Sequence, residues 1–104
     1  MKKALLLLIL FLTVADILPQ QRQMRAVWIT NVDSFVMFTD DAIAEAMDYL
    51  AKIGINVVFP VVWNKGYTLY PSAIMQNEFG VPIIANFAGR DPLKTIMIEA
   101  HRNG

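Results

Sequence analysis

The stretch that decides the fold is INVVFPVVWNKGYTLYPS, residues Ile55 to Ser72. Its first half places large apolar side chains on both sides of an extended backbone, with Val57, Phe59 and Val61 on one side and Val58 and Val62 on the other. A strand that is apolar on both faces is typical of a parallel sheet inside an α/β domain. The second half is rich in aromatic and polar residues. We therefore expect a buried strand followed by a functional loop.

Two strands with a helix between them are expected around this stretch. The segment RAVWITNV, Arg25 to Val32, is rich in β-branched and aromatic residues and predicts the first strand. The second strand is expected at Ile55 to Trp63, with a bulge or an early end at Pro60 because proline cannot donate a ladder hydrogen bond. Between them, Thr39 is a typical helix N-cap and Gly54 a typical helix stop. On the outer side of this helix, an ion pair is expected between Asp48 and Lys52.

A second helix is expected at the end of the chain. Asp91 is placed to cap it, with Pro92 at its first position. Its predicted apolar stripe consists of Leu93, Ile96, Met97 and Ala100. Residues 64–90 show no clear periodicity, and strand-to-helix connections are usually only about 2–6 residues long. Because this segment holds several aromatic residues, we expect an ordered loop.

The order strand, helix, strand, helix predicts a βαβα segment of the α/β class with a right-handed crossover. The helices would cover one face of the sheet, and the chain offers no cover for the other. Large side chains are expected on this uncovered face at Trp28, Phe59, Val61 and Trp63. Because whole domains are stable by only about 5–15 kcal/mol, the chain should be marginal unless it self-associates through this face or continues.

The amino-terminal residues are typical of a secretory signal peptide. Met1 to Lys3 carries positive charge, Ala4 to Val14 is apolar, and Thr13 to Ala15 offers a small-residue cleavage site. We expect a signal peptide at residues 1–15, a linker at 16–24 and an extracytoplasmic location, periplasmic or secreted. The apolar run is short of the roughly 20 residues that span a bilayer, so no stable membrane span is expected after cleavage. An uncleaved membrane anchor is the alternative.

Composition excludes several functions. Without residues 1–15 the chain carries 7 basic and 9 acidic residues, a net charge of −2, which does not favour nucleic acid as a partner. The chain has no cysteine, so disulfides and thiolate chemistry are excluded. No glycine-rich phosphate loop follows the first strand, which argues against a doubly wound nucleotide fold. No metal-binding constellation is visible, and no cofactor is expected.

Polar side chains follow both predicted strands: Asn31 and Asp33 after the first, Asn64 and Lys65 after the second. The carboxyl ends of parallel strands meet at one edge of the sheet, where barrel enzymes build their sites. Beside them, flat apolar surfaces for a pyranose ring are available from Trp63, Tyr67 and Tyr70. These residues form the predicted substrate site, although aromatic residues at this density are also ordinary core.

Three segments carry a resemblance to a known family: RAVWITNVDS, NVVFPVVWNKGYTLYPS and FAGRDPL, in that order and spacing. They resemble the opening of the glycosyl-hydrolase-like family ten, exported bacterial proteins with a (β/α)8 barrel. The resemblance covers about Met24 to Gly104. It implies the first two β/α units of an incomplete TIM barrel at residues 25–104, in a hydrolase acting on glycans, with peptidoglycan glycan strands as one candidate substrate.

The catalytic residues are not expected within this chain. Glycoside hydrolysis generally needs two carboxyls about 5–9.5 Å apart, and in barrel glycosidases they usually come from later strands. Asp33 is the one carboxyl expected at a strand end, and it equally suits a turn. His101 falls in the last turn of a helix, where the dipole explains it. We expect glycan contacts without a complete catalytic site; the alternative is a non-catalytic module that binds carbohydrate or self-associates.

Overall fold

The computed structural model describes residues 1–4 and 23–104 of the 104-residue chain. The predicted signal peptide and the predicted linker fall largely on residues 5–22, which lie outside the described residues. Among the helices that are described, none has both the length and the apolar character needed to cross a membrane.

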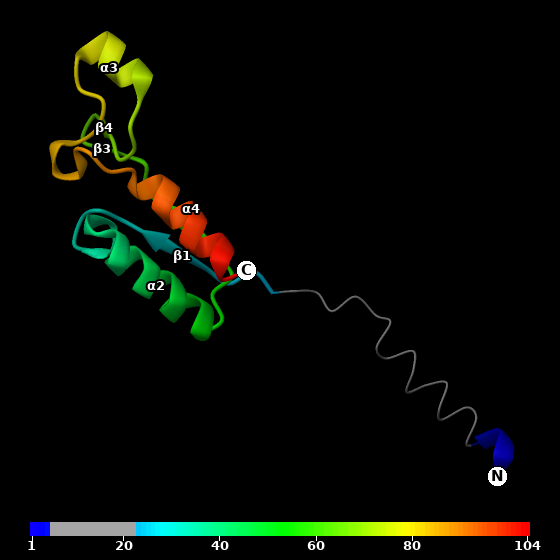
Figure 1. The fold of residues 1–104 in the computed structure, drawn as a ribbon. Coiled ribbons are helices and arrows are strands. Elements are labelled where there is room, and N and C mark those ends of the chain that lie inside the picture. The colour runs from blue at the N-terminus through cyan, green and yellow to red at the C-terminus, as the bar shows by residue number, and fades with distance from the viewer. Residues whose placement is uncertain (5–22) are drawn as a thin grey trace.

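The centre of the fold is a two-stranded parallel sheet (Figure 1). Strand β1 (Ala26–Ile29) pairs with β2 (Val57–Pro60), and Trp28 lies opposite Phe59. Both strands are shorter than predicted. The early end at Pro60 is confirmed, because β2 stops there and its missing N–H cannot continue the ladder.

Helix α2 (Asp40–Lys52) begins where the sequence predicts. The Thr39 hydroxyl accepts a hydrogen bond from the Ala42 N–H at 3.0 Å, which satisfies one of the free donors of the first turn. After the helix, Gly54 adopts a left-handed φ of 84°, a conformation that glycine adopts without steric cost. The predicted ion pair between Asp48 and Lys52 is wrong: Asp48 instead binds Arg102 of the last helix, 2.5 Å away.

Helix α4 (Pro92–Arg102) is capped by the Asp91 carboxylate, which accepts from the Lys94 N–H at 3.0 Å, as predicted. Its apolar stripe differs from the prediction, because Ile96 and Ala100 belong to the core or pack against it, whereas Leu93 and Met97 line an outer depression. Ile96 is buried, but Met97 is 53% exposed, because α4 packs on α2 through the side that carries Ile96.

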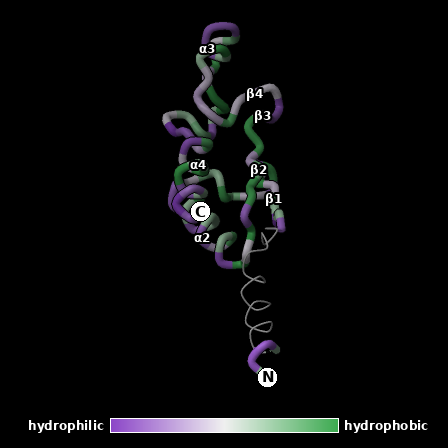
Figure 2. The backbone as a smooth tube through the Cα atoms, turned by 90° about the vertical axis from the view of Figure 1, so that its right-hand side faces the viewer, coloured by the Kyte–Doolittle hydropathy of each residue, from purple (hydrophilic) through white to green (hydrophobic). Residues whose placement is uncertain are grey.

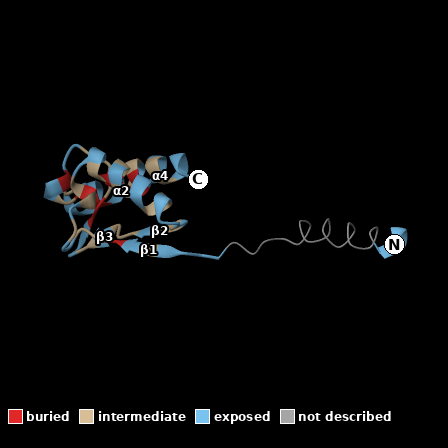
Figure 3. Ribbon diagram, turned by 90° about the horizontal axis from the view of Figure 1, so that it is seen from below, coloured by how far each residue is buried: buried red, intermediate tan, exposed pale blue. Residues whose placement is uncertain are grey.

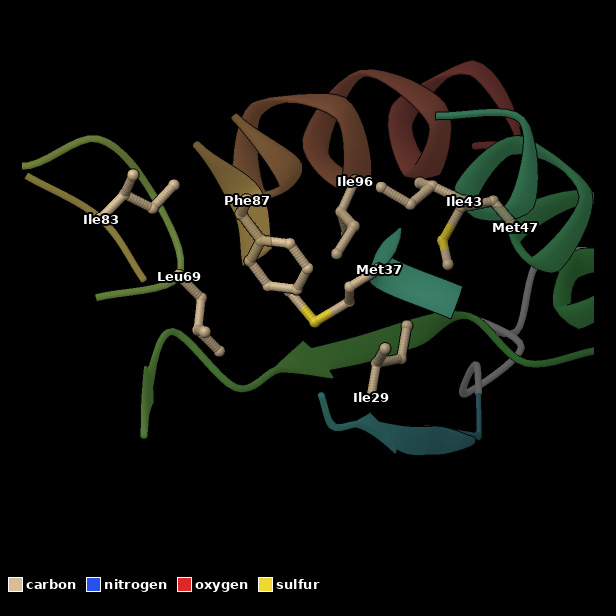
Figure 4. Packing of buried hydrophobic residues seen from close by; sticks show 8 residues of the cluster. All are labelled: Ile29, Met37, Ile43, Met47, Leu69, Ile83, Phe87 and Ile96. Carbon is tan, nitrogen blue, oxygen red and sulfur yellow. The ribbon is translucent and has the colours of Figure 1, made fainter. Parts of the chain in front are cut away.

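Helices α2 and α4 lie side by side on one face of the sheet (Figure 3). The core fills the space between this helical layer and the strands, and a short 3-10 helix η1 (Val36–Phe38) adds Met37 to it (Figure 4). The buried cluster consists of Ile29, Met37, Ile43, Met47, Leu69, Ile83, Phe87 and Ile96. One layer of helices therefore covers one face of the sheet.

The opposite face of the sheet has no cover within the described residues. Trp28 and Phe59 are 65% and 45% exposed, although Figure 2 shows their strands among the hydrophobic parts of the chain. Val61 was predicted on this open face, but it packs against the core instead. The reason is Pro60, which ends the strand and with it the simple alternation of side chains.

The segment between β2 and α4 is ordered, as predicted. It also contains secondary structure that the sequence did not predict. It forms a hairpin of β3 (Trp63–Asn64) and β4 (Tyr67–Thr68), helix α3 (Ala73–Phe79), and the 3-10 helix η2 (Ala85–Phe87). In Figures 1 and 2, α3 lies at the far end of the hairpin from the sheet. Thr68 closes the base of this excursion, where its carbonyl accepts from the Ile84 N–H at 3.0 Å.

Arg90 joins the beginnings of the two long helices. Its guanidinium donates to the carbonyls of Met37 and Phe38, at 3.2 Å and 2.8 Å, and to the Asp40 carboxylate. The Asp40 oxygen also accepts from the Thr95 hydroxyl at 3.2 Å. These bonds hold η1 and the start of α2 against the start of α4, at the end of the helical layer where the long loop arrives.

Candidate functional site

The structure brings together the loops that follow β1 and β2. Asn64 Nδ2 donates to Asn31 Oδ1 at 3.0 Å, and the two residues are 33 positions apart in sequence. Both side chains are half-buried. The two amides therefore lie together at the carboxyl ends of the two strands. This arrangement follows from the parallel pairing of β1 and β2, which places both carboxyl ends at one edge of the sheet.

The β3–β4 hairpin determines which aromatic residue accompanies the amides. Asn64 lies opposite Tyr67 in the antiparallel ladder, and Trp63 lies opposite Thr68. Side chains of directly opposite residues share a face of the ladder, and neighbours along a strand alternate. Tyr67, which is 41% exposed, therefore lies on the face of Asn64. Trp63 is exposed on the opposite face of the hairpin.

The turn of this hairpin consists of Lys65 and Gly66, with φ values of 53° and 82°. Positive φ at both central residues is the pattern of a type I′ turn, whose twist matches that of the flanking strands. Such turns favour Asn-Gly or Asp-Gly, so a lysine in the first position is strained. The Lys65 side chain is exposed beside the site residue Asn64.

Asp33, after β1, has a φ of 58°. In the described part of the chain, Asp33 and Lys65 are the non-glycine residues with positive φ. Each lies within two residues of one member of the Asn31–Asn64 pair. Strained backbone often occurs in ligand-binding loops, where the surrounding structure holds it in place. The strain is therefore concentrated in the two loops that hold the amides.

Tyr70 is not part of this group. It lines a depression of about 320 Å³ along the outer side of α4. The other lining residues are Asp91, Leu93, Lys94, Met97, Ile98 and His101. Of the seven residues predicted for the site, the structure thus joins Asn31, Asn64 and Tyr67, with Asp33 and Lys65 in the adjoining backbone. It places Trp63 and Tyr70 on other surfaces.

A larger hollow of about 520 Å³ lies at the opposite end of the sheet. Its walls are the last turns of α2 and α4 and the residues around the start of β2, among them Gly54, Asn56 and Asn103. These are the amino ends of the strands, away from the loops that carry the amide pair. This hollow is therefore distinct from the candidate site.

Most carboxylates with a described partner stabilise the helical layer. A hydrogen bond from Arg90 holds the pKa of Asp40 below its ordinary value of 3.8. Hydrogen bonds from Asn103 and Arg102 do the same for the pKa of Asp48. Asp33, exposed, is the carboxyl nearest the amide pair in sequence. Within residues 1–4 and 23–104, no three histidine, cysteine or acidic residues are grouped so that they could hold a metal ion.

Two features were missed by sequence reasoning. The hairpin signal was present in Lys65-Gly66 between aromatic residues, although the more typical Asn-Gly pair is absent. Helix α3 also has signals, since the Ser72 hydroxyl accepts from the Met75 N–H and Gly80 ends the helix with a φ of 72°. Its seven residues are too few for a helical period to be recognised.

Comparison with known proteins shows which family the chain resembles. A family model matches residues 23–104, and this match identifies the chain as glycosyl hydrolase-like. The family is Glycosyl hydrolase-like 10, and the chain belongs to it, which confirms the resemblance found in the sequence.

Curated relatives show the same relationship. Over 77 residues the chain is 34% identical to the glycosyl hydrolase DigH of Escherichia coli (strain K12), and equally to DigH of Shigella flexneri. The alignment covers 73% of this chain but 18% of each relative. The chain therefore spans about a fifth of the length of these relatives. No solved structure matches the chain significantly.

Proposed function

We propose that this chain is the amino-terminal part of a glycoside hydrolase, in which it forms the first two β/α units of a (β/α)8 barrel. Three features support the barrel. Strands β1 and β2 are parallel, α2 and α4 cover the same face, and the other face exposes Trp28 and Phe59. In a closed barrel that face would point inward and be packed by the remaining strands.

The proposed role of the chain is to bind glycan without providing a complete catalytic site. The observation that carries this proposal is the Asn31–Asn64 hydrogen bond, which fixes two amides at the carboxyl ends of the strands. Barrel enzymes bind substrate at that edge. The exposed ring of Tyr67 beside Asn64 offers an apolar surface to the face of a sugar ring, while the amides can bind its hydroxyl groups.

The proposal also includes a substrate and a location. Glycan strands of peptidoglycan are the candidate substrate, in an enzyme that works outside the cytoplasm. This location rests on the positively charged start, apolar run and small-residue site of residues 1–15.

A second candidate function is self-association. Trp28 and Phe59 form an exposed aromatic pair on the uncovered face, and such surfaces are buried in most stable proteins. A second copy of the chain would cover this face in a non-catalytic module.

A binding experiment on two tyrosines tests the proposed glycan site. Isothermal titration of the 104-residue chain with cellotetraose and with the tetramer of N-acetylglucosamine should detect binding to at least one. Tyr67→Ala should weaken that binding, and Tyr70→Ala, the matched control from another surface, should leave it within about twofold, as expected for a residue without ligand contact. Equal losses in both variants, or no binding of either tetramer, would contradict the proposed glycan site.

A further inference from the structure

The two amides of the candidate site use only part of their hydrogen-bonding capacity on each other. A primary amide has two N–H donors and a carbonyl oxygen with two lone pairs. Within the described residues, the bond from Asn64 Nδ2 to Asn31 Oδ1 is the one side-chain hydrogen bond that either amide makes. The NH₂ group of Asn31 and the carbonyl oxygen of Asn64 therefore remain free, and both residues are half-buried and so accessible from solvent.

We propose that Asn31 and Asn64 act as one preassembled recognition unit, in which Asn31 supplies the donor and Asn64 the acceptor to a single sugar ring. This inference rests on the proposed glycan function and assigns separate roles to its two amides. The ligand chemistry that fits is an acceptor and a donor on neighbouring ring positions. A pair of vicinal hydroxyl groups has this chemistry, and so does one amide substituent with its C=O and N–H.

Preassembly is what distinguishes this unit from two independent contacts. The mutual hydrogen bond holds each side chain in one conformation before ligand arrives, so less side-chain entropy is lost on binding. The backbone adds to this order, because Asp33 and Lys65 are held at φ values of 58° and 53° in the same two loops. Tyr67 lies across the ladder from Asn64 and presents its exposed ring on the same side.

Two isosteric substitutions test the unit because they affect its bonds differently. In Asn31→Asp the Oδ1 acceptor for Asn64 is kept, but the free donor becomes an acceptor. In Asn64→Asp the donor to Asn31 is lost, so two oxygens face each other and the loops separate. A purely structural pair would therefore tolerate the first change and be damaged by the second.

The experiment measures binding and folding together on the full 104-residue chain. Each variant is titrated by calorimetry with cellotetraose and with the tetramer of N-acetylglucosamine, and its thermal unfolding is followed by circular dichroism. We expect Asn31→Asp to unfold at the wild-type temperature but to bind about tenfold more weakly, as expected for a lost hydrogen bond to the ligand. The loss should persist at high salt, where an effect of the new charge at long range would be screened.

The outcomes separate this inference from the function on which it rests. If only the N-acetylglucosamine tetramer loses affinity in Asn31→Asp, the unit recognises the amide substituent; if both tetramers lose it, the unit recognises the hydroxyl groups. If Asn31→Asp binds within about twofold of the wild type, the pair is structural and the inference fails while the glycan function stands. If the wild-type chain binds neither tetramer, both fail.

Discussion

Trp28 and Phe59 lie opposite each other in the parallel pair of β1 and β2, with ring centroids 5.4 Å apart and both rings exposed. Their sequence neighbours Ile29 and Val58 point the other way, into the core under α2 and α4. One sheet thus has a covered aliphatic face and an uncovered aromatic face. This asymmetry gives the most direct test of how the sheet exists in solution.

Adjacent residues on the two faces should respond very differently to truncation. Ile29→Ala removes a buried side chain and should lower the free energy of unfolding by about 2–5 kcal/mol. Trp28→Ala removes a ring that is 65% exposed and should cost about 1 kcal/mol or less, as for most exposed positions. Urea unfolding at low protein concentration measures both.

The same pair of variants tests self-association. If Trp28→Ala is as damaging as Ile29→Ala, and the wild-type chain sediments as a dimer, the aromatic face is covered by a second copy. That outcome would favour the self-associating module over the barrel enzyme.

The strained turn of the hairpin should be improved by substitution. Lys65→Asn creates the Asn-Gly pair that type I′ turns prefer, and it should raise the free energy of unfolding by about 0.5–1 kcal/mol. Lys65→Ala removes the same charge but keeps a residue that disfavours positive φ, so it should not stabilise the chain. Equal stability of the two variants in urea unfolding would show that the turn is not strained at this position.

Arg90 should be required for packing between the beginnings of α2 and α4. Arg90→Ala leaves the half-buried carbonyls of Met37 and Phe38 without their donor, and it should cost about 1–3 kcal/mol of stability. Arg90→Lys keeps the charge but lacks the fork of donors, so most of the loss should remain. Full recovery of the unfolding midpoint with lysine would mean that charge alone matters at this position.

Acid should destabilise the chain through Asp40 and Asp48. Hydrogen bonds lower the pKa of both carboxyls from 3.8 in the folded chain, so the stability they contribute is present above about pH 4 and is lost as pH falls below it. Asp48→Asn should therefore lose less stability than the wild type between pH 6 and pH 3. Glu45→Gln, which changes another exposed acid on α2, is the matched control for thermal unfolding across this range.

Local signals in the sequence were sufficient to predict the two long helices, α2 and α4, and the order of strands β1 and β2 around α2. Thr39 and Asp91 cap the helices because a side-chain oxygen next to a free N–H is a local interaction. The partner of Asp48 could not be predicted in the same way, because Arg102 reaches it from a helix 54 residues away. Which side of α4 would be covered also depended on α2, and so Met97 was misplaced.

The sequence predicted where the candidate site lies better than it predicted which residues belong to the site. Parallel strands place their carboxyl ends together, which is why Asn31 and Asn64, predicted to follow the two strands, are hydrogen-bonded to each other. The hairpin after β2 then reverses the chain within two residues and puts Trp63 and Tyr67 on different faces. A short turn of this kind determines which way each nearby aromatic side chain points. The turn was not predicted because its Lys-Gly sequence is unusual for a type I′ turn.

A glycan site at the carboxyl ends of β1 and β2 is central to the proposed function. Site-resolved NMR titration of the full chain with the tetrasaccharides that it binds tests this claim directly. We expect the largest shifts at the side-chain amides of Asn31 and Asn64 and at Tyr67, with little change at Tyr70 and His101. Shifts confined to the depression along α4, or to the hollow at the amino ends of the strands, would contradict the account.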